Sequence, residues 1–388
     1  MRHFVASFTE TLWSDKAMCS SNLQRRYLGF SLIELMISLA LGLLIVLGVT
    51  DLYVNSSRTQ DDVSRASRQL ENSLFALDLL AGELALAGYW GEADYPLVAD
   101  DLTFGPLRPE EMAGEAVTGY PVPPLPCAGS GKEGRNPRVE LAWAMEYPLT
   151  SGLGVDLEVA MSSAACDTSI SPAKDTEEFF AIRRASTCAA GAPGGDKCAA
   201  IGNFFHIQSN GCSDANAGLS GGEVKLYRVT EFNAKSVLNY RGFDCGTEAS
   251  DRAPIYRYVS RIYYVNHRDE LVRLELEESN TYTETVLVEG VEALRFEWLI
   301  DRNLDGDYDV VRSVGDESWS EAQRAVDWQN VVGANMSMIV RSSTPEVGYR
   351  DSNIYELPGQ IWTIEKDEYQ RILRSRTVEF VNVAGRRR

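Results

Sequence analysis

The longest apolar run of the chain covers residues 30–50, and Glu34 is the only charged side chain within it. An apolar helix of about 20 residues can span the roughly 30 Å hydrocarbon core of a bilayer. Arg25 and Arg26 precede the run and Asp51 follows it, so the positive-inside rule predicts a cytoplasmic N-terminus. The pattern therefore predicts a single-pass membrane protein whose bulk lies outside the cytoplasm.

After Thr50 the sequence becomes polar, but apolar and small residues still recur at helical spacing. An unbroken helix from Phe30 to about Ala87 would be roughly 87 Å long, and Gly88 is a suitable C-terminal stop. The stripe fits either a coiled-coil dimer or a helix that packs on a sheet. Its mixed Val, Ala, Ser and Leu would make a weak dimer seam, which favours packing on a sheet. The stripe consists of Val63, Ala66, Leu70, Ser73, Leu77, Leu80, Leu84 and Ala87.

Beyond Gly91 short apolar runs alternate with Gly, Ser, Asn and Asp clusters, which is typical of β structure. The clearest pair, residues 258–266 and 270–278, is joined by His267–Asp269 and predicts a hairpin. Together the patterns predict an α+β fold, with the long N-terminal helix packed on an antiparallel β-sheet head. The other predicted strand regions are residues 139–145, 178–184, 203–209, 223–229, 283–300 and 334–343.

Charge and cysteine content narrow the class of protein. A net charge of -19 argues against a nucleic-acid partner, because such a protein needs a basic face to replace phosphate counterions. Six of the seven cysteines lie in the presumed external part, which favours disulfide-pinned loops over a zinc site, since no C-x-x-C pair is present. The pairing is not deducible from the sequence. These six are Cys127, Cys166, Cys188, Cys198, Cys212 and Cys245.

The residues around the start of the apolar run, RRYLG followed by FSLIEL, closely resemble the processing site of type IV prepilins and the related pseudopilins. The resemblance implies that a prepilin peptidase cuts between Gly29 and Phe30 and methylates the new amine. It also implies that Glu34 pairs with the N-terminal amine of a neighbouring subunit during assembly, which would neutralise a carboxylate inside the membrane. A plain signal anchor, the alternative, does not need Glu34. A leader of 29 residues is long, and we expect translation to start at Met18.

Several segments resemble the PilW family of minor pilins. They are residues 79–91 at the end of the helix, residues 288–309, residues 326–343 and the C-terminal residues 374–385. The resemblance implies a non-catalytic minor pilin that primes or assists assembly of a type IV pilus. Its implied partners are the prepilin peptidase, other minor pilins, the major pilin and the inner-membrane assembly platform. A minor pseudopilin of a type II secretion system and a membrane-anchored calcium-dependent adhesin are the alternatives.

This resemblance also implies a division of the chain and a location for each part. The protein would lie in the inner membrane with its head in the periplasm, and would then enter the pilus at the cell surface. The predicted parts are a leader (1–29), a transmembrane and filament-core half of the helix (30–55), an amphipathic half (56–91) and a β-rich head (92–388).

Two further motifs suggest chemistry outside the helix. The segment DRNLDGDYD has the order of an EF-hand-type loop, in which alternating oxygen ligands and a central Gly wrap a calcium ion. A polar hairpin turn is the alternative interpretation, since Arg312 occupies the twelfth position. The candidate ligands are Asp301, Asn303, Asp305, Asp307 and Asp309. The segment GLSGG at 218–222 fits a nucleophile-elbow pattern but lies in a loop, so catalysis is not expected.

Overall fold

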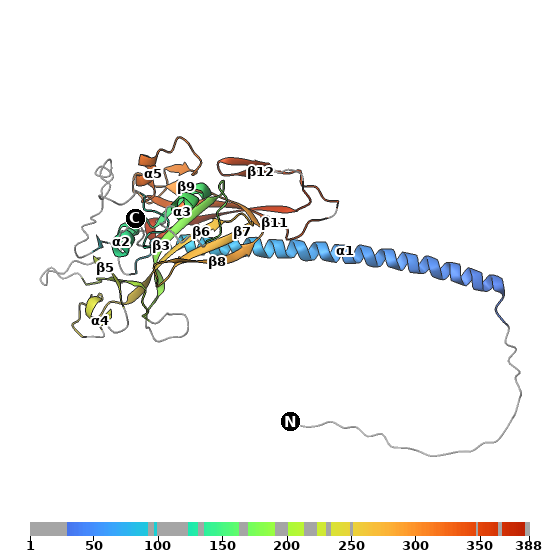
Figure 1. The fold of residues 1–388 in the computed structure, drawn as a ribbon, viewed down its shortest axis with the longest axis horizontal. Helices are drawn as coiled ribbons and strands as arrows, with labels where there is room; N and C mark the ends of the chain where they lie inside the picture. The colour runs from blue at the N-terminus through green and yellow to red at the C-terminus, as the bar shows by residue number, and fades with distance from the viewer. Residues whose placement is uncertain are drawn as a thin grey trace, which may run out of the picture. The chain divides into compact units, whose positions relative to one another are not determined.

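A computed structural model describes the N-terminal helix and most of the head. The described residues are 29–91, 97–98, 123–130, 136–162, 170–190, 201–212, 223–229, 234–248, 251–346, 348–363 and 367–384. The chain divides into two units, residues 1–61 and residues 62–388. The predicted α+β arrangement, a long N-terminal helix packed against antiparallel β-sheets, is confirmed (Figure 1).

Within the first unit, helix α1 (Leu32–Ala85) is apolar on all sides from Leu35 to Val49 and becomes polar from Asp51 onward. Every described side chain from Gly29 to Asp61 is exposed, including Leu32 (78%) and Ile45 (66%). A helix that is hydrophobic on all sides requires an apolar environment. By length and composition α1 is a helix that could cross a membrane.

Within the second unit, the same helix buries one face in the head. The periodicity prediction holds from Ser73 onward, but Val63, Ala66 and Leu70 are exposed. Burial begins instead at Gln69, which was not a predicted stripe position. The buried residues of α1 are Gln69, Ser73, Ala76, Leu77, Leu80, Ala81 and Leu84.

Helix α1 ends at Ala85, close to the predicted stop. Gly88 has a φ of 72°, a left-handed conformation that only glycine adopts without strain. Its N–H donates to the carbonyl of Arg183 at 3.1 Å, and the side chain of Asn382 donates to the carbonyl of Ala85 at 3.1 Å. Hydrogen bonds therefore fix the end of the helix to residue 183 of one strand and to residue 382 of the short C-terminal helix.

Eight strands form the larger sheet, in the order β1-β5-β4-β6-β3-β2, with β7 paired to β6 and β8 paired to β7. Neighbours are antiparallel except for β1 and β5, which are parallel. The predicted hairpin is β6–β7. The bounds are β1 (Leu97–Val98), β2 (Leu149–Leu153), β3 (Glu178–Ala189), β4 (Phe205–Ser209), β5 (Glu223–Arg228), β6 (Ile255–Val265), β7 (Glu270–Leu276) and β8 (Tyr282–Glu289).

Four strands form a second antiparallel sheet, in the order β10-β9-β11-β14. A two-stranded hairpin, β12 (Ile354–Leu357) and β13 (Gln360–Thr363), covers part of its outer face. Figure 1 shows this hairpin beside β9 and β11. The four strands are β9 (Val291–Ile300), β10 (Val310–Arg312), β11 (Val331–Arg341) and β14 (Arg371–Glu379).

Residues 139–145, predicted to be a strand, belong to helix α2 (Pro137–Met145) instead. Asn136 caps this helix by accepting the N–H of Arg138 at 3.0 Å, and Pro137 occupies the first turn, where its missing N–H costs nothing. The N-cap and the proline, which favour the start of a helix, therefore decided the structure of a segment whose apolar run suggested a strand. The remaining helices are α3 (Gly154–Ser162), α4 (Ala234–Val237), α5 (Glu321–Asp327) and α6 (Val381–Ala384).

The main core lies between α1 and both large sheets. It stacks Phe180 on Tyr263 (ring centroids 5.0 Å apart) and Phe296 on Trp298 (4.7 Å), and Trp298 meets Trp328 edge-on at 5.3 Å. A second core on the opposite face of the eight-stranded sheet is covered by α2 and α3. Packing on both faces makes the head a rigid support for the end of α1.

Candidate functional site: the N-terminal segment and the helix anchor

The predicted processing residues lie together at the start of α1. Gly29, Phe30 and Ser31 precede the helix, and Phe30 is 82% exposed. The carbonyl of Ser31 accepts the backbone N–H groups of Glu34 and Leu35 at 3.0 and 3.1 Å, which makes Ser31 the residue where the helix begins. A peptide bond just outside a helix, with no buried side chains around it, has a backbone that a protease can reach.

Glu34 occupies the first turn of α1. A negative side chain at this position interacts favourably with the partial positive charge of the helix N-terminus. Among the described residues the Glu34 carboxylate has no side-chain partner, and its neighbours along α1 are uncharged and exposed. In hydrocarbon such a carboxylate needs a cation from another molecule.

Two family profiles match the chain, one near its N-terminus and one in its C-terminal third. The profile of the prokaryotic N-terminal methylation motif matches residues 24–50, which contain Gly29, Phe30 and Glu34. The profile of the type IV pilus-assembly protein W (PilW) matches residues 258–382, from β6 to the start of α6. Over residues 258–382, about a third of the chain, the sequence is therefore similar to the PilW family, as the sequence analysis predicted. No curated protein and no solved structure matches the chain significantly.

PilW is a non-catalytic pilin family of type IV pilus-assembly proteins, so the expectation that the chain is not an enzyme is confirmed by the family. The two histidines considered as bases have ordinary positions. His206 is buried in β4, where burial lowers its pKa and Nδ1 lies 2.9 Å from the carbonyl oxygen of Phe204. His267 lies in the β6–β7 turn. Residues 218–222 lie outside the described residues.

Beyond the N-terminus, ion pairs anchor α1 in the head. Glu83, on α1, reaches Arg184 of β3 at 3.3 Å and Arg261 of β6 at 2.7 Å. Arg261 also pairs with Glu275 of β7 at 3.1 Å. Burial alone would lower the pKa of Arg261, but the two carboxylates outweigh burial and raise it. The helix is therefore tied by charge to three adjacent strands as well as by apolar packing.

A second polar contact fixes the helix where its burial begins. The side-chain amide of Gln69 donates to the carbonyls of Val340 (2.6 Å) and Gln370 (3.0 Å), at the ends of β11 and β14. Asp78 forms an ion pair with Arg376 of β14. Sequence reasoning missed Gln69 and Glu83. The available signal was a Gln and a Glu directly beside the stripe residues Leu70 and Leu84, because polar groups at the edge of a core require partners.

A buried carboxyl pair links the two sheets. Burial raises the pKa of Glu178 to about 8, against the opposing effect of Arg295, and burial also raises the pKa of Glu177. Arg295 Nη1 lies 3.7 Å from Glu178 Oε1, too far for a hydrogen bond, while Glu177 accepts the N–H of Leu294 at 3.0 Å. One arginine thus faces two carboxyls, so Glu178 is protonated at neutral pH.

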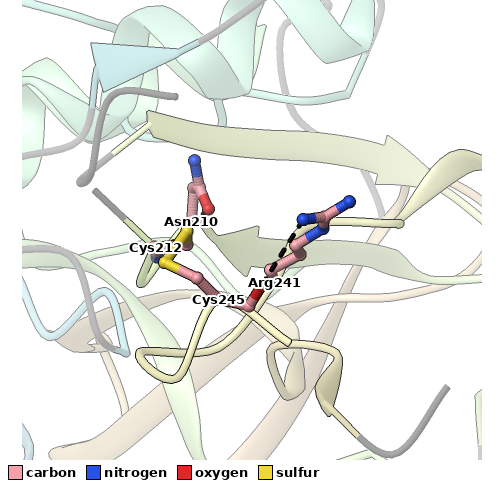
Figure 2. Close-up of a disulfide and its surroundings, with 4 residues drawn as sticks. All are labelled: Asn210, Cys212, Arg241 and Cys245. Atoms are coloured by element: carbon pink, nitrogen blue, oxygen red, sulfur yellow. Dashed lines mark hydrogen bonds between the residues drawn. A yellow bond between two sulfur atoms is a disulfide. The ribbon is translucent and has the colours of Figure 1, made fainter. Parts of the chain in front are cut away.

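A disulfide joins Cys212, after β4, to Cys245 (Figure 2). The N–H of Cys212 donates to the side-chain oxygen of Asn210 at 3.2 Å, and the Arg241 guanidinium donates to the carbonyl of Cys245 at 3.4 Å. Cys127 and Cys188 are also disulfide-bonded. Their partners, like Cys166 and Cys198, lie outside the described residues, so the remaining pairing stays a prediction.

The acidic segment at 301–309 forms a turn between β9 and β10. The carboxylate of Asp301 is fully buried and accepts the N–H groups of Leu304 (2.6 Å) and Gly306 (2.9 Å). Gly306 has a φ of 96°, which explains the glycine at this position. The Asp309 carboxylate accepts the N–H groups of Arg302 (2.9 Å) and Asn303 (3.0 Å). The backbone of the turn thus supplies donors to its own acidic side chains.

The side-chain oxygens of this turn are not arranged as calcium ligands, because they accept hydrogen bonds from the backbone of the turn. Asn303 and Asp305 accept the N–H groups two residues ahead, at 3.0 and 2.9 Å. Among the described residues no three His, Cys, Asp or Glu side chains are grouped so that they could hold a metal ion. The structure therefore favours the hairpin-turn interpretation, and calcium binding stays a prediction to be tested.

Proposed function

We propose that the chain is a minor pilin that primes or assists assembly of a type IV pilus. In this proposal the leader is cut between Gly29 and Phe30 on the cytoplasmic side, and the new amine is methylated. The apolar part of α1 then holds the subunit in the inner membrane until it enters the filament. The head, residues 92–388, lies in the periplasm and later outside the cell.

One observation carries the proposal. The methylation-motif match includes the exposed apolar run at residues 30–50, in which Glu34 is the only charged residue. It occurs in a chain whose residues 258–382 match the PilW model. An ordinary membrane anchor gains nothing from a carboxylate, which costs about 2.5–3.5 kcal/mol at the centre of a membrane helix. A pilin subunit does gain, because the methylated amine of a neighbour is the cation that the carboxylate lacks.

The physical role proposed for Glu34 is to set the axial position of each entering subunit. The attraction between two opposite charges is much stronger in a medium of low dielectric constant than in water. A subunit displaced by one helical turn would leave both the amine and the carboxylate unpaired in hydrocarbon. The ion pair would therefore select one stagger even though apolar side chains allow many.

Peptide mass mapping of the native N-terminus tests the proposal. It should be done side by side on sheared surface filaments and on membranes. A methylated peptide beginning at Phe30 in the filaments is the expected result. The same peptide found only in membranes would instead indicate a pseudopilin or a primer that stays behind. An intact leader in both fractions would overturn the proposal and leave the anchored adhesin.

A matched pair of variants tests the role of Glu34. Glu34→Ala should leave cleavage at Gly29 intact and abolish recovery of the chain in sheared filaments. Ser38→Ala, one turn further along α1, removes only a hydroxyl that donates to the carbonyl of Leu35 at 2.9 Å, and it should assemble normally. Equal recovery of both variants would show that the carboxylate has no part in assembly.

A further inference from the structure

Strand β14 is the outer strand of the four-stranded sheet, and within the described part of the chain it pairs only with β11. Two backbone hydrogen bonds just beyond the ends of β14 show which of its residues bond to β11. The N–H of Ser342 donates to the carbonyl of Gln370, and the N–H of Phe380 donates to the carbonyl of Val332, both at 2.8 Å. In an antiparallel pair hydrogen-bonded and non-bonded residue pairs alternate. The even-numbered residues of β14 therefore bond to β11.

The odd-numbered residues direct their backbone groups away from β11. Leu373, Ser375 and Thr377 each present one N–H and one C=O at the outer edge of the sheet. Ser375 and Thr377 are exposed, and so are the intervening Arg374 and Arg376. This is a run of unpaired backbone of the kind to which an extended peptide adds as a further strand.

One face of this edge borders a polar groove of about 560 Å³ beneath the tip of the β12–β13 hairpin. Side-chain hydrogen bonds order its floor. Thr377 donates to Asn335 at 2.8 Å, and Asn335 donates to Glu297 at 3.0 Å. Ser375 and Ser337 share a hydrogen bond of 2.8 Å. The charged residues that line the groove are Glu297, Glu356 and Arg376. The side chain of Arg376 pairs with Asp78 of α1, so the charges left to the groove are acidic and its other polar side chains are mostly hydroxyls.

The opposite face of the same edge is basic. Arg374 and Arg376 alternate with the groove residues and lie on the side of the sheet that packs against α1. Arg376 is already paired with Asp78. Arg374 is exposed and has no ion pair or side-chain hydrogen bond within the described residues. The two faces of one strand edge thus carry opposite charge.

We infer that the open edge of β14 receives an extended strand from a different pilus subunit. The charges specify that strand. Residues opposite Arg374 and Arg376 should be acidic, and the alternating residues facing the groove should be basic or hydroxyl-bearing, because directly opposed side chains share a face. The identity of the partner as a pilus subunit rests on the proposed function.

A second copy of the chain fits this edge poorly. Antiparallel pairing of β14 with itself would place arginines of the two copies opposite or diagonal to one another, and like charges across strands are destabilising. Charged side chains on an edge strand also suppress unselective pairing. Both effects act in the same direction, since they reject strands of the wrong charge pattern and leave the backbone open to the right one.

The test uses the full-length chain in its native piliated cells, with photoreactive benzoylphenylalanine in place of Thr377. The matched control carries the same probe at Ile361, which is 68% exposed on the hairpin. After irradiation, crosslinked peptides from membranes and filaments are mapped by mass spectrometry. The probe at position 377, but not at 361, should crosslink to one extended segment of another pilus subunit with alternating acidic and basic or hydroxyl-bearing residues.

Two variants in the probe-bearing chain separate edge pairing from mere proximity. Arg374→Glu should lower the crosslink yield roughly tenfold, whereas Arg374→Lys should preserve it. Ser375→Pro removes one outward N–H and keeps the backbone hydrogen bonds to β11, and it should also lower the yield. It also removes the hydroxyl that bonds to Ser337; Ser375→Ala removes that hydroxyl alone and should not lower the yield. Formation of the Cys212–Cys245 disulfide shows that each variant has folded.

No crosslink at position 377, a crosslink to a second copy of the chain, or an undiminished yield in Arg374→Glu would each overturn the inference. These results are distinct from failure of the proposed function. If the N-terminal peptide beginning at Phe30 is absent from all fractions, the pilin assignment fails. If that peptide is present and position 377 finds no partner strand, only the edge inference fails.

Discussion

The anchoring of α1 in the head can be tested by truncating Leu80, a fully buried side chain in the core between the helix and both large sheets. Leu80→Ala removes three carbons, worth about 0.8 kcal/mol each in lost burial. The cavity left behind adds to this loss, because a core packed on both sides relaxes only partly. A decrease of roughly 3–4 kcal/mol in the free energy of unfolding is expected, within the range of about 2–5 kcal/mol for buried leucines.

Leu74→Ala is the matched control on the same helix. Leu74 is 49% exposed, so its truncation should cost about 1 kcal/mol or less. Both variants are compared with the parent as mature chains in detergent, by urea unfolding followed through tryptophan fluorescence. Trp143, Trp298 and Trp319 belong to the same core as Leu80 and report its opening. Equal losses in the two variants would refute the conclusion that this half of α1 is part of the core.

Three other predictions concern the head. Replacing Cys212 and Cys245 together by Ser opens a loop with a sequence separation of 33 residues, and it should cost about 3.7 kcal/mol in urea unfolding; an unchanged midpoint would contradict this. Because the pKa of Glu178 rises from 4.5 to about 8 on folding, the folded state binds the extra proton and stability should fall as pH rises between these values. Glu178→Gln should therefore be more stable than the parent at about pH 9, and a parent-like pH profile would disprove the assignment. Asp301→Ala should lower the free energy of unfolding by about 2–3 kcal/mol in thermal unfolding without calcium. It leaves the N–H groups of Leu304 and Gly306 without their acceptor. Calorimetric heat with calcium that disappears in Asp305→Ala would instead support the metal interpretation.

Long periodic features were predictable from the sequence. The apolar run, the helix from residue 32 to 85 and the β6–β7 hairpin follow from hydrophobic spacing and turn residues, which act locally. The N-terminal methylation motif was predictable for a similar reason, since its residues are adjacent in the chain. Features written in a continuous stretch of sequence need no knowledge of tertiary contacts.

One local feature was missed. Apolar residues 139–145 suggested a strand, although Asn136 and Pro137 already carried the start signals of a helix.

Tertiary features were not predictable from local patterns. Gln69 replaced Leu70 at the edge of the core because two backbone carbonyls at the ends of β11 and β14 needed a donor there. The strand order β5-β4-β6-β3 and the separation into two large sheets depend on long-range pairing, which single-sequence patterns do not record.

Two glutamates on α1 illustrate how the same side chain acquires different roles. Glu83 is part-buried in the head, where Arg184 and Arg261 supply two cations from adjacent strands, so its charge is satisfied within the chain. Glu34 lies in an apolar segment where the described residues offer no cation. A carboxylate in hydrocarbon remains costly until it is paired, and here the partner must come from another molecule. The need for a cation holds Glu83 inside one subunit. In the assembly proposed above, the same need at Glu34 would be a reason for one subunit to bind the next.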